Sequence, residues 1–342
     1  MSDTPVVLIT GAGGEIGHGL IHRLADDGTY GIVSLDLRGL APELAGLCSA
    51  SITGDILDRE LLAKIFAEHN IVGIFHLAAM LSSSGERNPE RAFDVNVNGT
   101  MNLLSLAAEH ARQHQRDVRF LFPSTIAVYG LPDQETKDAA GKVGEDQFLN
   151  PITMYGVNKL ASEHLGRYYA RHYGALSENR SEWRVDFRAL RFPGLISADT
   201  VPSGGTSDYV PEMLHAVASG TPYACFARED TRIPFMTMPD AVDSIVGLFE
   251  APASNLTRTV YNVGAFAPSA REVEELLRQT WPDAQVTYEV HQSRQDFLDT
   301  WPADVDDSAA RNDWGYTPQH GFEEAFSSYL IPALAGAGEA EV

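Results

Sequence analysis

The stretch VVLITGAGGEIG, from Val6 to Gly17, places a short apolar run directly before a glycine-rich turn and the start of an amphipathic segment. Glycines in such a turn let the backbone approach a pyrophosphate closely, and the N-terminus of the following helix attracts its negative charge. A glycine-rich turn alone is weak evidence, but this position after a strand is the context that dinucleotide binding requires. We therefore expect the contacts to a dinucleotide to come from Gly11, Gly14, Glu15, Ile16 and Gly17.

The alternation of short apolar runs and longer amphipathic stretches continues to about residue 125. The runs are VVLIT, IVSLD, SITGD, VGIFHLAA and VRFLFPST. Parallel strands need crossover helices, so this rhythm predicts an α/β fold, a Rossmann-type doubly wound parallel sheet with helices on both faces.

The second half of the chain lacks this rhythm and is richer in Gly, Pro and Ser from Pro193 onward. We expect residues 1–190 to form the Rossmann domain. Residues 191–334 should form mainly a smaller substrate-binding lobe, with some segments returning to the sheet, and residues 335–342 a frayed tail. The polar stretch 175–183 is predicted to be a surface insertion.

Composition narrows the possible partners. The chain has 342 residues and a formal net charge of −22, which disfavours nucleic acids and anionic membranes and leaves small molecules or other subunits. The apolar run after Met1 is too short for a signal peptide or a membrane span, so we expect a cytoplasmic protein. Cys48 and Cys225 lack metal-ligand spacing, and no metal is expected.

Two carboxylates follow predicted strands at positions suited to the adenosine half of a dinucleotide. Asp36 ends VSLD about twenty residues after the glycines, where it can accept both ribose hydroxyls and repel a 2′-phosphate, which favours NAD over NADP. Arg38 could instead accept that phosphate. Asp55 ends SITGD and is predicted either to meet the adenine or to cap a helix.

Tyr155 and Lys159 are four residues apart in MYGVNKLASEHL, so a helix would present both on one face. An adjacent ammonium and an oxidised nicotinamide favour ionised tyrosine, which can then act as a base. This spacing is common on helix surfaces. Here, however, a dinucleotide turn precedes it, and the hydroxyls of Ser124 and Thr125 end a strand about thirty residues earlier.

Together TGAGGEIG, HLAA, NVNGT, PSTIAVYG and YGVNK resemble the extended short-chain dehydrogenase/reductase superfamily (the NAD-dependent epimerase/dehydratase family) over nearly the whole chain. The resemblance implies that Tyr155, Lys159 and Thr125 are catalytic. It implies further cofactor contacts from Asp36, Asp55, Ile56, Leu77, Ala78, Ala79, Asn96, Ser124, Tyr155, Lys159, Phe192 and Pro193. Asn96 is expected to support a proton-conducting water near Lys159.

Three stretches of the second half look like the short-chain type of L-threonine 3-dehydrogenase: LRFPGLISADTVPSGGTSDYVPEM, CFAREDTRIPFMTMPDA and DTWPADVDDSAARNDWGYTP. That resemblance implies NAD-dependent oxidation of the 3-hydroxyl of L-threonine to 2-amino-3-oxobutanoate. It implies substrate contacts from Ser82, Thr125, Tyr155, Gly194 and Thr206. The sequence departs from the pattern by a longer loop from Leu131 to Asn150 and by Phe192, Ser203, Phe235 and Thr237.

Three other functions remain open at this point. A nucleotide-sugar epimerase or dehydratase would use the same Tyr, Lys and Thr, and Arg228, Arg232 and Arg258 could clamp its diphosphate. The second alternative is a dehydrogenase of a related 3-hydroxy acid. The remote alternative is a non-catalytic NAD-sensing regulator. Relatives pair through two long helices, here Glu90 to Arg112 and Met154 to Tyr173, which implies a homodimer.

Overall fold

The computed structural model describes residues 4–178, 180–200 and 205–339, and its chain divides into two compact units. Unit 1 contains Met1–Ser124, Met154–Arg191 and Val242–Tyr261, and unit 2 contains Thr125–Thr153, Phe192–Ala241 and Asn262–Val342. The units interleave along the chain, so the boundary predicted near residue 190 is only one of the points at which the chain passes between them. Each unit is considered below by itself.

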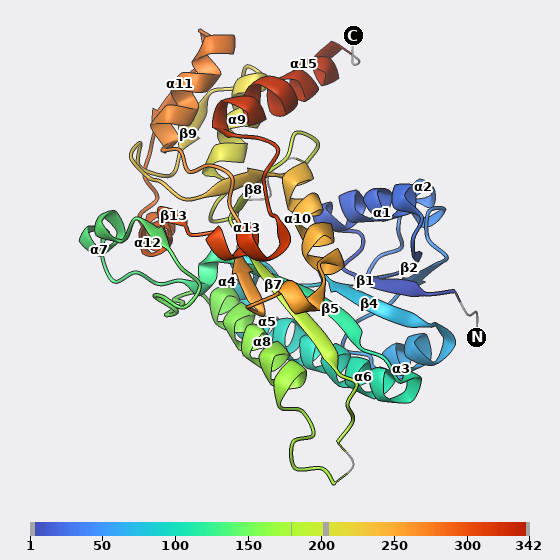
Figure 1. Ribbon diagram of the computed structural model, residues 1–342. Coiled ribbons are helices and arrows are strands. Elements are labelled where there is room, and N and C mark those ends of the chain that lie inside the picture. The colour runs from blue at the N-terminus through green and yellow to red at the C-terminus, as the bar shows by residue number, and fades with distance from the viewer. Residues whose placement is uncertain (1–3, 179, 201–204, 340–342) are drawn as a thin grey trace. The chain divides into compact units, whose positions relative to one another are not determined.

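Unit 1 is built on a seven-stranded sheet (Figure 1). Its order is β11-β7-β5-β4-β1-β2-β3, and the pairs β1/β2, β1/β4, β2/β3 and β4/β5 are parallel. The order reverses around β1, which confirms the predicted doubly wound fold. The strands are β1 (Val6–Thr10), β2 (Gly31–Asp36), β3 (Ala50–Thr53), β4 (Ile71–His76), β5 (Val118–Thr125), β7 (Val185–Phe192) and β11 (Val260–Asn262).

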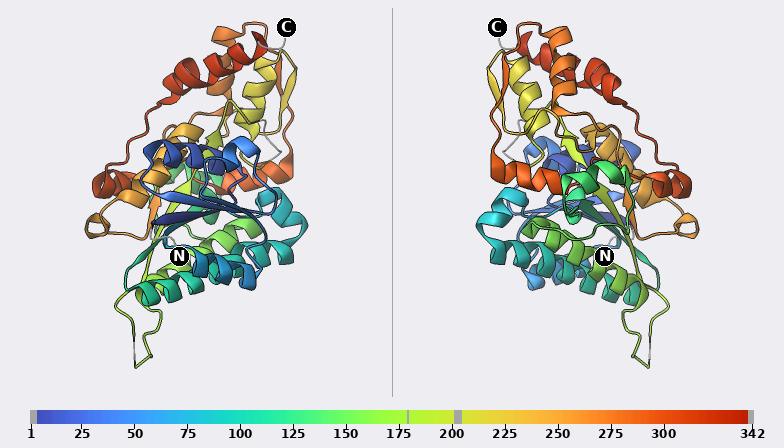
Figure 2. Two further views of the ribbon diagram at one scale, coloured as in Figure 1. Left: turned by 90° about the vertical axis from the view of Figure 1, so that its right-hand side faces the viewer. Right: turned by 90° about the vertical axis from the view of Figure 1, so that its left-hand side faces the viewer.

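Helices cover both faces of this sheet, as the edge-on views of Figure 2 show. The helical elements in this part of the chain are α1 (Glu15–Asp27), α2 (Pro42–Ala45), α3 (Arg59–Glu68), α4 (Ser82–Arg87), α5 (Pro89–Phe93), η1 (Asp94–Asn98), α6 (Gly99–His114), α8 (Met154–Arg171), α10 (Met238–Glu250) and η3 (Ala253–Asn255). The run predicted from Glu90 to Arg112 thus contains a π-helical turn, η1, between α5 and α6.

The core of unit 1 lies between the sheet and α3, α6 and α8. All five residues of β1 are buried, as expected for a parallel strand covered on both sides. Leu62 and Ile65 of α3 and Leu103 and Leu104 of α6 pack in the same cluster at 2% exposure or less. Burial of such side chains, worth about 1.5 to 3 kcal/mol each, is the main stabilising term.

A buried arginine joins α10 to the sheet of unit 1. The guanidinium of Arg188, in β7, donates to the carbonyls of Leu248, Phe249 and Ala251 at 2.7, 3.0 and 2.6 Å and pairs with Asp186. These carbonyls at the end of α10 have no partners within the helix, so the arginine satisfies them.

Unit 2 consists of short strand pairs and helices. Its parallel pairs are β8 (Gly194–Ile196) with β10 (Phe235–Thr237), β9 (Tyr223–Cys225) with β12 (Val286–Tyr288), and β6 (Lys142–Val143) with β13 (Asp304–Val305). Its helical elements are η2 (Ile126–Val128), α7 (Gln134–Ala140), α9 (Tyr209–Ala218), α11 (Ala270–Thr280), α12 (Gln292–Thr300), α13 (Ser308–Trp314), α14 (Phe322–Glu324), η4 (Ala325–Leu330) and α15 (Ile331–Glu339).

Two segments differ from their sequence-based description. The long loop from Leu131 to Asn150 contains α7 and β6, and so has secondary structure of its own. Helix α15 extends to Glu339, whereas a frayed tail was predicted from residue 335. The stretch 175–183 is irregular where it is described, consistent with a surface insertion.

Candidate active site

The glycine-rich turn between β1 and α1 is shaped by close backbone contacts. Gly11 has φ +71°, and a Cβ there would lie 2.5 Å from the backbone nitrogen of Ala78. A Cβ on Gly17 would collide with the carbonyl of Ala12. Gly14 is the N-cap of α1 and has no side chain to fill the space before the helix. The turn therefore leaves backbone and a helix N-terminus free to meet a pyrophosphate, which fits the predicted NAD site.

Asp36 at the end of β2 lies against this turn. Its carboxylate accepts the backbone N–H of Gly13 at 2.9 Å and that of Arg38 at 3.1 Å. The carboxylate that should bind the adenosine ribose is thus already held in place by the glycine-rich turn. This arrangement fits NAD, because a 2′-phosphate here would face a fixed negative charge.

The contacts after β3 distinguish between the two roles predicted for Asp55, a helix cap and an adenine contact. Asp58, not Asp55, is the N-cap of α3, accepting the N–H groups of Glu60 and Leu61. Asp55 accepts the N–H of Leu57 at 2.9 Å and pairs with Arg91 at 3.0 Å. The helix-cap alternative for Asp55 is therefore wrong, and the adenine contact stays a prediction.

Ile56, predicted to contact the cofactor, is 5% exposed and packs in the core of unit 1. Its side chain lies where a Cβ on Gly99 would be, 2.5 Å from Cδ1. A contact between Ile56 and NAD would therefore come mainly from its backbone.

Leu77, Ala78 and Ala79 follow β4 and begin the next loop. The N–H of Leu77 donates to Thr10 at 2.9 Å, which fixes this segment beside the end of β1. The preceding His76 is fully buried between the hydroxyls of Thr10 and Thr100, at 2.7 and 2.9 Å. Burial, assisted by the positive charge of Lys159, lowers the pKa of His76 to about 3, so this imidazole is neutral at ordinary pH.

Asn96 lies in the π-helical turn η1 and holds the loop after β4. Its side-chain amide accepts the N–H of Met80 at 2.8 Å and donates to the carbonyl of the same residue at 3.0 Å. Its own carbonyl accepts hydroxyls from Thr100 and Ser162 at 2.6 and 3.1 Å. These contacts explain Asn96 as a positioning group for the loop, and its predicted role toward a water stays a prediction.

Tyr155 and Lys159 lie in the first two turns of α8, as predicted. The ammonium of Lys159 donates to the carbonyl of Pro123 at 2.6 Å and lies 4.5 Å from the centre of the Phe122 ring and 5.6 Å from that of Tyr155. The lysine is thus directed from α8 toward the end of β5, on the same side as the tyrosine.

Burial disfavours the charged form of both side chains. It lowers the pKa of Lys159 to about 7, an effect that the carboxylate of Glu163 partly offsets, and it raises the pKa of the half-buried Tyr155. The sequence-based expectation is that the Lys159 ammonium and an oxidised nicotinamide together favour the ionised tyrosine, which would oppose this effect of burial. That expectation stays a prediction.

A buried ionic cluster that the sequence did not predict continues the same helix face. Glu163 is fully buried, accepts the hydroxyl of Ser124 at 2.6 Å, and binds the guanidinium of Arg191 at 2.9 and 2.8 Å. Arg167 lies 3.6 Å away. The signal was the spacing of Tyr155, Lys159 and Glu163, each four residues after the last.

Thr125 is the last residue of β5 and belongs to unit 2. Its hydroxyl oxygen accepts the N–H of Ala127 at 3.2 Å and so caps η2. That bond uses an oxygen lone pair and leaves the hydroxyl proton for another acceptor. The hydroxyl of Ser124 instead donates to Glu163, so these contacts favour Thr125 over Ser124 as the catalytic hydroxyl.

The residues predicted to bind substrate are distributed over both units. Ser82 begins α4 in unit 1, whereas Gly194 and Thr206 are buried in unit 2. A side chain at Gly194 would collide with the ring of Phe235, which is a packing reason for this glycine. Ser203 lies outside the described residues.

Three of the positions that depart from the family pattern, Phe192, Phe235 and Thr237, are buried in unit 2. Phe192 and Phe235 are 5% and 0% exposed, and Pro193 follows Phe192 at the end of β7. Thr237 is fully buried and bonds the carboxylate of Asp240 at 2.8 Å, which in turn contacts His320 at 2.9 Å. Thr237 therefore serves a polar cluster at the start of α10.

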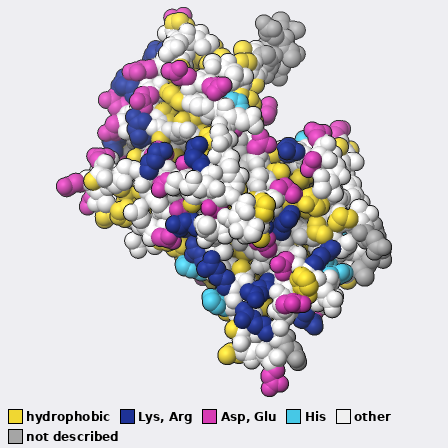
Figure 3. Space-filling model, in the orientation of Figure 1, with side chains coloured by type: hydrophobic (Ala, Val, Ile, Leu, Met, Phe, Trp, Pro, Cys, Tyr) yellow, Lys and Arg dark blue, Asp and Glu magenta, His cyan; other side chains and the backbone are white. Residues whose placement is uncertain are grey.

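Among residues 4–178, 180–200 and 205–339, no group of three or more His, Cys, Asp or Glu could hold a metal ion. In the same ranges, none of the helices has the length and apolar character needed to cross a membrane. Cys48 and Cys225 are free thiols. Asp and Glu are interspersed with Lys and Arg on the face shown in Figure 3.

Comparison with known proteins identifies the class. Residues 7–264 match the NAD dependent epimerase/dehydratase family, and the chain belongs to this family of extended short-chain dehydrogenases. The mitochondrial L-threonine 3-dehydrogenase of Bos taurus is 37% identical over 94% of this chain and 80% of its own.

Solved structures of the same kind cover almost the whole chain. L-threonine 3-dehydrogenase from Trypanosoma brucei is 35% identical with a TM-score of 0.83, and covers 96% of this chain and 98% of its own. A monomeric L-threonine 3-dehydrogenase from a metagenome is 34% identical with a TM-score of 0.82, and covers 97% and 99%. The chain is an NAD-dependent oxidoreductase, and the three relatives named above, at 34% to 37% identity, are L-threonine 3-dehydrogenases.

Proposed function

We propose that this enzyme oxidises the 3-hydroxyl of L-threonine to 2-amino-3-oxobutanoate with formation of NADH. The observation that carries the proposal is similarity to L-threonine 3-dehydrogenases along nearly the whole chain, including unit 2, where the substrate-specific stretches lie. The placement of Tyr155 and Lys159 on one face of α8 supports the chemistry.

In the proposed reaction, Tyr155 removes the proton of the 3-hydroxyl and Thr125 donates a hydrogen bond to the same oxygen. NAD, when bound, accepts the hydride from C3. Lys159 stabilises the tyrosinate electrostatically and is proposed to bond the nicotinamide ribose. Pro123 holds the lysine through its carbonyl at 2.6 Å, so the ammonium needs little reorganisation during turnover.

The cofactor site is proposed to extend along the ends of β1, β2 and β4. The turn from Gly11 to Gly17 would hold the pyrophosphate and Asp36 the adenosine ribose, as their close contacts support. The amino acid would be held by Ser82 and Thr206 together with Gly194, which stay predictions from the resemblance.

A nucleotide-sugar epimerase or dehydratase is the second candidate, because the family includes such enzymes. Two of the three arginines considered as diphosphate clamps are engaged within unit 2. Arg228 forms a two-pronged pair with Asp299 at 2.8 and 2.9 Å, and Arg232 pairs with Glu272 at 2.8 Å. Recruiting them for a diphosphate would break these pairs, which favours the amino acid substrate.

Oligomeric state and location are also proposals. A homodimer through α6 and α8 is supported by the exposure of Met101, Val157 and Tyr168, at 39%, 44% and 48%, on these helices. Because one relative is monomeric, the oligomeric state has to be measured by sedimentation equilibrium. A monomer at micromolar concentration would exclude this dimer.

A cytoplasmic location would be tested by fractionating cells that produce the protein.

The function is tested by NADH absorbance with purified enzyme, NAD and L-threonine. Parallel reactions contain D-threonine, L-serine, simple 3-hydroxy acids or nucleotide sugars. We expect one NADH per L-threonine, abolished in Tyr155→Phe and retained in Tyr173→Phe, an exposed tyrosine just beyond the same helix. NADH from a 3-hydroxy acid alone would replace the substrate assignment. Conversion of a nucleotide sugar without net NADH would establish the epimerase or dehydratase. If no substrate is turned over and Tyr155→Phe leaves the biological activity of the protein intact, the result would support the regulator.

A further inference from the structure

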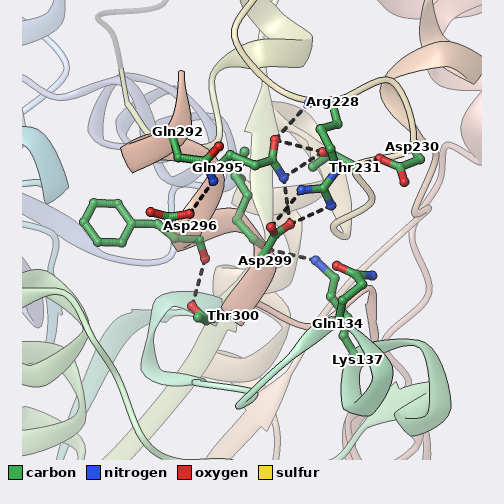
Figure 4. A network of polar contacts seen from close by, with 12 residues as sticks. Gln134, Lys137, Arg228, Asp230, Thr231, Gln292, Gln295, Asp296, Asp299 and Thr300 are labelled. Carbon is green, nitrogen blue, oxygen red and sulfur yellow. Dashed lines mark hydrogen bonds and ion pairs between the residues drawn. The ribbon is translucent and has the colours of Figure 1, made fainter. Parts of the chain in front are cut away.

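Helix α12 in unit 2 is fixed by a polar network on one of its faces (Figure 4). Gln295 is fully buried, and its side-chain oxygen accepts the N–H of Arg228 at 2.8 Å. Its amide nitrogen donates to Asp299 at 2.7 Å and to Thr231 at 3.0 Å. Asp299 also binds the guanidinium of Arg228. These bonds fix the rotation of α12 about its axis.

The C-terminal end of α12 is held as well. Lys137 of α7, labelled in Figure 4, is buried and donates to the carbonyl of Leu298 at 2.8 Å. The N–H of Leu131 donates to the carbonyl of Thr300 at 2.8 Å. The carbonyl of Leu298 also accepts the N–H of Trp301 at 3.3 Å. The bonds from Lys137 and Leu131 tie the segment from 131 to 140 to α12.

Arg294 extends from this fixed helix to a different segment of unit 2. Its guanidinium lies over the ring of Phe226, 3.2 Å from the ring centre, and 3.8 Å from the carboxylate of Glu212 in α9. It also donates a hydrogen bond to the carbonyl of Gly205. A stacked, planar guanidinium with two polar partners has one preferred position, which a lysine could not reproduce.

Gly205 is held on its other side by Asp208. The N–H of Gly205 donates to the carboxylate of Asp208 at 2.5 Å, and its carbonyl accepts the N–H of Asp208 at 3.3 Å. The next residue, Thr206, is 7% exposed. The main chain that carries Thr206 is therefore fixed from two directions.

We propose that Arg294 is a positioning residue for the substrate. It holds the carbonyl of Gly205 and thereby sets the position of Thr206, which binds the amino acid in the proposed function on which this inference rests. In this proposal Arg294 acts through Gly205 and not by direct contact with the substrate or the cofactor. A merely structural ion pair would affect stability alone, whereas a positioning residue changes the apparent affinity for one substrate.

The test compares Arg294→Gln and Arg294→Lys with Arg271→Gln. Arg271 is a matched control because it pairs with Glu229 and lies 5.5 Å from the Tyr288 ring centre, in the same unit. We expect Arg294→Gln to raise the KM for L-threonine roughly tenfold, the effect of losing one charge-assisted hydrogen bond, with kcat and the KM for NAD within about twofold of wild type. Arg294→Lys should give an intermediate KM and Arg271→Gln an unchanged one.

Hydrogen–deuterium exchange of residues 205–212 with NAD bound provides a readout that does not depend on the substrate. Arg294→Gln should exchange faster there than wild type and Arg271→Gln. Equal exchange in all three proteins would overturn the proposal, whichever substrate the enzyme uses. Faster exchange with an unchanged KM for L-threonine would also overturn it. If wild type does not oxidise L-threonine, the proposed function fails and with it the role toward this substrate, while the exchange result still decides whether Arg294 holds the segment.

Discussion

The hydroxyl of Ser124 donates a 2.6 Å hydrogen bond to the buried carboxylate of Glu163. The same carboxylate binds Arg191 from β7, so one side chain of α8 joins two strands of the sheet. Lys159 lies one helical turn earlier and bonds Pro123, the residue before Ser124. The catalytic helix is therefore fixed to the end of β5 by two adjacent polar contacts.

Replacing Glu163 by Gln should destabilise the protein strongly. Gln can still accept the Ser124 hydroxyl, but it leaves the guanidinium of Arg191, which is fully buried, without its counter-charge. Breaking a buried pair in this way costs about 3 to 5 kcal/mol. Glu250→Gln is the control, because its 3.7 Å pair with Arg119 is partly exposed and should contribute less than about 1 kcal/mol. Urea unfolding of both variants gives the comparison, and equal losses would contradict the role assigned to Glu163.

His76 should contribute to the loss of stability in acid. Its pKa in the folded protein is about 3, below the ordinary value of 6.5, so the folded state resists its protonation. This contribution is fully present above pH 6.5 and is lost as pH falls from there toward 3. His76→Asn should therefore flatten the pH dependence of the unfolding free energy in this window relative to wild type. His18→Asn, at an exposed position, is the comparison variant, and identical curves for wild type and His76→Asn would refute the prediction.

A comparison of Gly11 with Gly28 distinguishes the effect of a close backbone contact from the effect of a positive φ. Both have positive φ, +71° and +66°, but a Cβ on Gly28 would meet nothing within 4 Å, whereas one on Gly11 would press on Ala78. Gly28→Ala should cost about 1 to 2 kcal/mol of stability and leave NAD binding intact. Gly11→Ala should abolish NAD binding. Isothermal titration with NAD measures the affinity of each variant for NAD. Equal affinities would show that the turn tolerates a side chain.

Asp36 should control the choice between NAD and NADP. Asp36→Asn keeps an oxygen for the N–H of Gly13 but removes the charge, so kcat/KM for NAD should fall roughly tenfold while that for NADP rises. Asp36→Ala removes the acceptor as well and should lower the melting temperature in addition. Steady-state rates with each cofactor test this, and an unchanged ratio of the two kcat/KM values in Asp36→Asn would exclude the role.

The sequence was sufficient to predict the elements whose signal is local. VVLIT and VRFLFPST form β1 and β5, and Tyr155 and Lys159 share a face of α8 because four residues make about one helical turn. The pairing of Glu163 with Arg191 was not predictable in this way, because 28 residues separate them and only the fold brings them together. Asp58, rather than Asp55, caps α3, whereas the sequence-based prediction names only Asp55 for this role.

The last strand of the Rossmann sheet, β11, has a consequence for synthesis. Its neighbour β7 ends at Phe192, but β11 begins only at Val260, so a ribosome adds 67 residues before β7 can be covered. Until then β7 is an open sheet edge whose unpaired backbone groups can join another nascent chain. We therefore expect a fragment ending near residue 190 to be prone to aggregation rather than to act as a minimal nucleotide-binding module.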